Sequence, residues 1–212
     1  YIEGQNITIE YRYSEGKIDD ETVPAYRGEE KVSPSSSTET FAAMKLSVDN
    51  WRWAGVPFFV RVGKRLPKAS TEIAIQFKSA PAVLFNVDGQ TIDPNALVIR
   101  IQPDEGVALR MSSKMPGSSL RIEPVKMDFH YGTSFGKATP EAYERLLLDA
   151  MSGDATLFAR RDEVEEAWKF VDAIRAEWEE SADDLALYAA GTWGPTEADE
   201  LIKRFSATWR RL

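Results

Sequence analysis

The sequence predicts an α+β protein with one large, mostly antiparallel sheet and helices packed on one face of that sheet. Three observations lead to this prediction. Strand-like hydrophobic runs dominate from Thr40 to His130, the links between them are mostly too short for helical crossovers, and helical spacing dominates the remainder of the chain. Strands followed by helices are typical of α+β domains, and short links favour antiparallel pairing.

The strand-like runs are separated by clusters of Gly, Pro, Asn and Asp, which are typical of turns. In chain order they read TFAAMKLS, VPFFVRVG, TEIAIQFK, ALVIRIQ, GVALRMSS and LRIEPVKMDF. Two runs alternate in polarity, and their apolar positions are Ile73, Ile75, Phe77, Leu97, Ile99 and Ile101. One face of the sheet is therefore expected to be apolar and to be covered by the second half of the chain.

Three helices are expected after the strands. The first begins near Pro140 and ends before Gly153. The second carries apolar residues at spacings of three and four between residues 164 and 178. The third follows GPTEADE, in which Thr196 and Asp199 have a spacing like that of a capping box. The acidic residues of RRDEVEEAW are interpreted as a solvated helix face, because paired catalytic carboxylates must converge on one pocket.

Residues 1–38 are polar and rich in turn formers, with too few regularly spaced apolar residues for a core element. We therefore interpret them as a connecting segment, partly irregular, and residues 39–212 as the folded domain. The chain opens without an initiator Met, so a fragment of a longer protein is expected.

Composition narrows the classes of function. The chain is 43% hydrophobic and 28% charged, which is typical of a soluble globular protein. Its net charge of -8 argues against general binding to nucleic acid or to anionic membranes. It has no Cys, which excludes disulfides and Cys-based zinc sites, and no apolar run approaches the ~18 residues of a membrane helix. We expect a cytoplasmic protein without a metal, in which any anionic ligand is held by a local cluster of cations.

Several kinds of catalytic motif are missing. No GxGxxG or P-loop string is present, so the chain lacks a dinucleotide site of its own that can be identified from sequence. His130 is the only histidine, and its flanks, MDFHYG, favour a structural role over a catalytic or ligand-binding one. The aromatic string NWRWAG at residues 50–55 is interpreted as core packing in preference to an interface.

The expected hairpin between VPFFVRVG and TEIAIQFK carries three cations, Lys64, Arg65 and Lys68. A turn does not require cations, and the residues alone favour a solubilising turn. Against this, Lys64 directly follows a strand and Gly63, so its ammonium group projects from the rim of the sheet as a point charge for a phosphate. Gln102, at the end of a neighbouring strand, adds a neutral hydrogen-bonding group at this rim.

Several long strings, in the right order, resemble the C-terminal domain of glucose-6-phosphate dehydrogenase in its bacterial form. They are SSSTETFAAMKLSVDNWRWAGVPFFVRVGKRLPK, TEIAIQFK, ALVIRIQPDEGV, PEAYERLLLDAMSGDATLFARRDEVEEAW and GTWGPTEADELI. The resemblance runs from about Tyr13 to the C-terminus, whereas residues 1–12 match poorly.

The resemblance implies that the full-length protein oxidises glucose 6-phosphate to 6-phosphoglucono-δ-lactone with NADP or NAD, at the entry to the oxidative pentose phosphate pathway. In this family an N-terminal Rossmann domain, absent from this chain, binds the coenzyme and carries the catalytic His–Asp pair. The chain alone is therefore expected to be inactive, to associate with its own N-terminal domain, and to form homodimers or tetramers through its sheet. A non-catalytic sugar-phosphate-binding or assembly protein on the same fold is the competing interpretation.

Site residues also follow from the resemblance. The lysine of the family's GK motif, which binds the substrate, corresponds to Lys64, and the glutamine of its IRxQP motif, which lines the substrate pocket, corresponds to Gln102. The family usually has a second cation where this chain has Ala69. Lys68 is the candidate replacement, although neighbouring residues of an extended segment point in opposite directions.

Some animal members of the family bind an additional, structural NADP on this domain. The residues at or near the positions of that site are Arg61, Arg100, Arg110 and Asp128. An arginine, a tyrosine and another arginine of the site are replaced here by Ala74, Ala108 and Trp193. Because these replacements remove two cations and a stacking ring, no structural NADP is expected.

Overall fold

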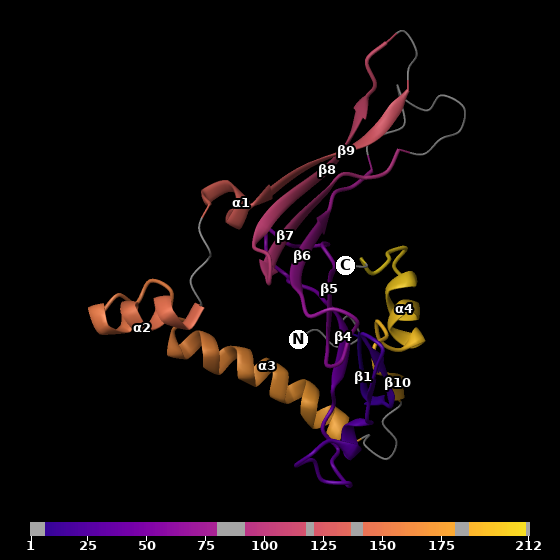
Figure 1. The fold of residues 1–212 in the computed structure, drawn as a ribbon, viewed down its shortest axis with the longest axis vertical. Helices are drawn as coiled ribbons and strands as arrows, with labels where there is room; N and C mark the ends of the chain where they lie inside the picture. Colours follow the sequence, from indigo (N-terminus) through magenta and orange to yellow (C-terminus); the bar gives the residue numbers. More distant parts are fainter. Residues whose placement is uncertain (1–6, 80–91, 118–120, 137–141, 181–186, 211–212) are drawn as a thin grey trace. The chain divides into compact units, whose positions relative to one another are not determined.

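The computed structural model describes residues 7–79, 92–117, 121–136, 142–180 and 187–210 (Figure 1). It divides into two compact units. The first unit combines residues 1–68 with residues 158–211, and the second consists essentially of residues 69–157. The first unit is therefore built from both ends of the chain. None of the helices in the described ranges is long and apolar enough to cross a membrane.

A four-stranded sheet forms the centre of the first unit, in the order β10-β1-β4-β5. Its strands are β1 (Ile7–Ser14), β4 (Phe41–Leu46), β5 (Phe58–Gly63) and β10 (Leu187–Ala189). β4 pairs antiparallel with β1 and β5, whereas β10 pairs parallel with β1. A small hairpin of β2 (Gly16–Ile18) and β3 (Glu21–Val23) and a 3-10 turn, η1 (Tyr26–Gly28), complete the N-terminal part.

The hydrophobic core of the first unit lies between this sheet and helix α4 (Thr196–Lys203). Phe41 is its largest fully buried side chain, and its ring contacts those of Tyr11 and Tyr188. Ala198 and Leu201 of α4 belong to the same cluster. The acidic first turn and the basic last turn of α4 suit the helix dipole. In the first unit, α4 is thus a helix that packs on one face of the sheet.

The N-terminal segment differs from the sequence-based expectation. Residues 1–38 were expected to lack a core element, but β1 lies inside the sheet, and Tyr11 and Tyr13 are buried in the core cluster. Tyrosine is half polar, so its burial is hard to predict from sequence, and the cluster that contains these two rings includes Tyr188 and Leu201 from the distant C-terminal segment. The aromatic string at residues 50–55 differs as well, because Trp51 is fully exposed and only Trp53 stacks against Phe58.

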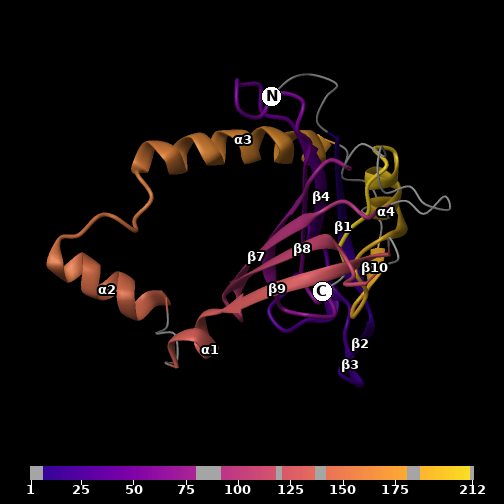
Figure 2. The ribbon, with the colours of Figure 1, turned by 90° about the horizontal axis from the view of Figure 1, so that it is seen from above.

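A second four-stranded sheet, in the order β6-β7-β8-β9, lies in the second unit (Figure 1). Figure 2 shows its strands β7, β8 and β9 side by side. Its strands are β6 (Thr71–Gln76), β7 (Ala96–Gln102), β8 (Gly106–Lys114) and β9 (Ile122–His130), all antiparallel to their neighbours. The register pairs Ile73 with Ile99 and Ile75 with Leu97, so these predicted apolar positions share one face. Ile73, Ile75, Phe77 and Ile101 are nevertheless exposed, so the expectation that the second half of the chain covers this face is wrong for the described residues. Within the described strands, β5 and β6 belong to different sheets, so the link between them is not a hairpin turn.

Two helices follow in the second unit, α1 (Tyr131–Phe135) and α2 (Ala142–Ser152). The 20-residue α3 (Arg161–Glu180) belongs to the first unit. α2, α3 and α4 confirm the three predicted helices, although the predicted start near Pro140 lies outside the described residues. Pro195 rather than Thr196 precedes the first turn of α4, and no side chain caps it, so the predicted capping box is wrong. The α+β class and the mostly antiparallel pairing are confirmed.

Candidate functional site

The main chain of Lys64 is held at both of its polar groups. Strand β5 ends at Gly63, and the amide of Lys64 then donates to the carbonyl oxygen of Thr40 at 2.8 Å. The carbonyl oxygen of Lys64 accepts a hydrogen bond from the Tyr188 hydroxyl at 2.7 Å. The side chain is exposed, and within the described part of the chain its ammonium group forms no hydrogen bond or ion pair. Lys64 thus presents an unpaired charge from a fixed position.

Glycine at position 63 brings this turn close to the core. A Cβ atom there would lie 2.8 Å from the Phe41 ring and 3.1 Å from the Leu66 side chain, so a larger residue would displace one of them. Leu66 in turn packs against the core cluster. The turn is therefore anchored immediately before and after Lys64.

Arg65 is also fixed by contacts within the protein, so it does not serve merely to make the turn soluble. Its backbone has a left-handed φ of 51°, its carbonyl oxygen accepts from the Gly191 amide at 2.8 Å, and its guanidinium group pairs with Glu29 at 2.7 Å. Glu29 accepts a second hydrogen bond from the Tyr13 hydroxyl at 2.9 Å. The Arg65 guanidinium group, and then the Tyr13 hydroxyl, lower the pKa of the Glu29 carboxyl group below its usual value.

Lys68 lies in the first unit with Lys64, and its side chain is exposed. In the described ranges its ammonium group has no hydrogen-bond or ion-pair partner. Within the described residues, Lys64 and Lys68 are therefore unpaired, whereas Arg65 forms an ion pair with Glu29.

Gln102 belongs to the second unit, at the end of β7. Its side-chain amide nitrogen donates to the Thr71 hydroxyl at 3.1 Å, and its main-chain oxygen accepts from the Ser70 hydroxyl at 3.4 Å. The side chain is exposed, and its amide oxygen has no hydrogen-bond partner among the residues that the structure describes. This oxygen is available to accept a hydrogen bond from a ligand hydroxyl.

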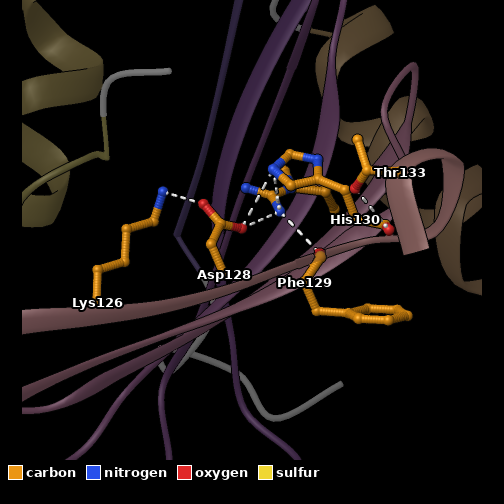
Figure 3. A network of polar contacts seen from close by, with 6 residues as sticks. Lys126, Asp128, Phe129, His130 and Thr133 are labelled. Atoms are coloured by element: carbon orange, nitrogen blue, oxygen red, sulfur yellow. Dashed lines mark hydrogen bonds and ion pairs between the residues drawn. The ribbon is translucent and has the colours of Figure 1, made fainter.

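A network of polar contacts joins Arg100 of β7 to residues of β9 (Figure 3). Arg100 pairs with Asp128, donates to the Phe129 carbonyl oxygen at 3.1 Å, and lies 3.2 Å from Nε2 of His130. Asp128 also pairs with Lys126. The Arg100 guanidinium group, and then the Lys126 ammonium group, hold the pKa of the Asp128 carboxyl group far below its usual range. His130 therefore belongs to a network of protein groups.

Gly106 makes room for this network. It lies opposite both Arg100 and His130 in the strand register. A Cβ atom at position 106 would lie 2.3 Å from the Phe129 carbonyl oxygen and 2.8 Å from Nη2 of Arg100. Sequence reasoning did not single out Gly106, because only the register shows what surrounds it.

The other two residues at the structural-NADP positions have their own contacts. Arg110 pairs with Asp93 at 2.5 Å in the second unit. Arg61, in the first unit, lies 5.2 Å from the centre of the Trp193 ring and 4.9 Å from that of Trp209. Its guanidinium group also donates to the Trp193 carbonyl oxygen at 3.2 Å. Within the described residues, no group of three or more His, Cys, Asp and Glu side chains is placed to hold a metal ion.

Comparison with known proteins finds relatives that share most of this chain's sequence range. Glucose-6-phosphate 1-dehydrogenase of Aggregatibacter actinomycetemcomitans is 50% identical over 200 residues, covering 94% of this chain and 40% of the relative. The enzyme of the same name from Treponema pallidum is 48% identical, covering 95% of this chain and 40% of the relative. The chain thus spans about two fifths of the length of these curated relatives (40%).

Solved structures are similar as well. One is a glucose-6-phosphate dehydrogenase in complex with its substrate glucose-6-phosphate, with a TM-score of 0.82 and 32% identity over 96% of this chain and 41% of the other. Another is glucose-6-phosphate 1-dehydrogenase from Mycobacterium avium, with a TM-score of 0.73 and 31% identity over 96% of this chain and 40% of the other. The model of the family described as glucose-6-phosphate dehydrogenase, C-terminal domain, matches residues 2–210. The match includes residues 2–12, which were expected to match poorly. The chain belongs to this family.

Proposed function

We propose that this chain is the C-terminal, substrate-binding part of a cytoplasmic enzyme that oxidises glucose 6-phosphate to 6-phosphoglucono-δ-lactone in the oxidative pentose phosphate pathway. The hydride acceptor is NADP or NAD, which binds to an N-terminal domain outside this chain. The observation that carries the proposal is Lys64, whose ammonium group is unpaired within the described residues while its main chain is held by Thr40 and Tyr188.

Each candidate residue has a role that matches its chemistry. The Lys64 ammonium group is a compact charge that suits a phosphate oxygen or a sugar hydroxyl. The free amide oxygen of Gln102 accepts a hydrogen bond from a sugar hydroxyl. Lys68, whose ammonium group has no partner in the described ranges, supplies the second cation in place of Ala69.

The remaining parts of the reaction lie outside this chain. The N-terminal domain supplies the coenzyme site and the His–Asp pair that deprotonates the sugar 1-hydroxyl, so this domain alone shows no turnover. The domain assembles as a homodimer or tetramer through its sheet. No structural NADP binds here, and the contacts of Arg61, Arg100 and Arg110 support this, because each guanidinium group already has protein partners.

The test is a Lys64→Ala change in the full-length protein. Loss of one charged hydrogen bond is expected to weaken binding of glucose 6-phosphate by about 1.5–3 kcal/mol, measured as an increase in its Michaelis constant. Lys31→Ala is the matched control, because Lys31 is an exposed cation of the same unit whose side chain is 88% accessible. An unchanged Michaelis constant in Lys64→Ala would contradict the role of Lys64. A protein that binds the sugar phosphate without reducing NADP or NAD would contradict the enzyme assignment.

A further inference from the structure

We propose that Tyr188 is a positioning residue for Lys64: its hydroxyl group holds the Lys64 carbonyl oxygen and so directs the lysine side chain toward the anionic group of the substrate. This inference rests on the proposed function, because it concerns the same substrate lysine. It adds a residue 124 positions away in the sequence, from a strand that carries no charged group.

The hydrogen-bond geometry singles out the Lys64 carbonyl group as the partner of Tyr188. Three oxygen atoms surround the Tyr188 hydroxyl: the carbonyl oxygen of Lys64 at 2.7 Å, the carbonyl oxygen of Thr40 at 3.2 Å and the hydroxyl oxygen of Thr40 at 3.4 Å. A phenol has one proton to donate. The closest acceptor, Lys64, receives it, and the Thr40 hydroxyl group can donate to the phenol oxygen in return.

Tyr188 is itself held in place, so it can act as a fixed support. It is 3% exposed, and its ring packs against Phe41 at 5.3 Å and Tyr13 at 6.3 Å between centroids. Burial raises the pKa of the Tyr188 hydroxyl above its usual value, so the group stays protonated and remains a donor at neutral pH. The strand that carries it, β10, is fixed by parallel pairing with β1.

The same C-terminal segment holds two consecutive carbonyl groups of the turn. Tyr188 donates to the carbonyl oxygen of Lys64, and the Gly191 amide donates to that of Arg65 at 2.8 Å. On the opposite side, the Lys64 amide donates to Thr40. The peptide groups on both sides of Lys64 are therefore ordered by the protein before a ligand arrives. Such preorganisation strengthens binding because less conformational freedom is lost when the ligand binds.

The test compares Tyr188→Phe with Tyr11→Phe in the full-length protein. Both changes remove a hydroxyl group from a buried tyrosine of the same core cluster, but only Tyr188 contacts Lys64. Tyr188→Phe is expected to raise the Michaelis constant for glucose 6-phosphate about three- to tenfold, the effect of one lost hydrogen bond, with kcat and the Michaelis constant for the coenzyme nearly unchanged. Tyr11→Phe is expected to leave all three values near those of the wild type.

A double mutant separates positioning from general loss of stability. If Tyr188 acts through Lys64, adding Tyr188→Phe to Lys64→Ala is expected to cause no further increase in the Michaelis constant for the sugar phosphate. Equal effects of Tyr188→Phe and Tyr11→Phe, or additive effects in the double mutant, would overturn the positioning role and leave the proposed function standing. A wild-type protein without glucose 6-phosphate oxidation would overturn both.

Discussion

Replacing Gly106 by alanine is expected to destabilise the second unit, although intrinsic propensity argues for the opposite result. Alanine in place of a strand glycine gains about 0.5–1 kcal/mol from conformational entropy. The added methyl group would lie 2.3 Å from the Phe129 carbonyl oxygen, a distance that Cβ atoms essentially never show, and 2.8 Å from Nη2 of Arg100. Overpacking of this kind costs about 1–3 kcal/mol, so a net loss of up to about 2.5 kcal/mol is expected.

Urea unfolding followed by circular dichroism measures this loss in free energy. Gly132→Ala is the matched control, because a Cβ atom at that helical glycine would meet no heavy atom within 4 Å. A local readout is the NMR signal of the imidazole of His130, the only histidine of the chain, which is expected to shift in Gly106→Ala and to stay in place in Gly132→Ala. A Gly106→Ala protein that unfolds at the wild-type urea concentration or above, with the His130 signal unmoved, would refute this reasoning.

Two further predictions concern the ion pairs and the core. The pKa of Asp128 is lower in the folded state than in the unfolded state because of Arg100 and then Lys126. The contribution of Asp128 to stability is therefore complete above about pH 4 and is lost as the pH falls further. Urea titrations are expected to show Asp128→Asn less stable than wild type at neutral pH, by a margin that shrinks below about pH 4, and a constant margin would contradict this. Phe41→Ala removes the largest fully buried ring and is expected to cost about 3–5 kcal/mol in urea unfolding, whereas a loss below about 1 kcal/mol would show that Phe41 is not central to the core.

The parts of the fold that depend on local pattern could be predicted from the sequence. The alternation at Ile73 and Ile75 indicates a strand with one apolar face, and the register against β7 confirms it. The burial of Tyr11 could not be predicted in this way, because its core cluster is completed by residues such as Leu201 from the other end of the chain.

The candidate site could likewise be predicted only in part. The family motif is sufficient to single out Lys64 and Gln102 from the sequence. The contacts that hold Lys64 could not be predicted, because Thr40 and Tyr188 carry no charge and resemble ordinary strand residues. Arg65 looked solvated for a similar reason, since its partner Glu29 lies in a segment that seemed to be a connector.

The parallel pairing of β10 with β1 affects the order in which the protein can fold during synthesis. The ribosome releases Lys64 and its turn long before it releases Tyr188, and the first unit is completed only when the residues of β10 and α4 have joined the N-terminal strands. The second unit is continuous in sequence and can fold earlier, since domains generally fold as units during synthesis. A nascent chain that stopped before β10 would therefore contain every predicted substrate residue and yet lack the support for Lys64.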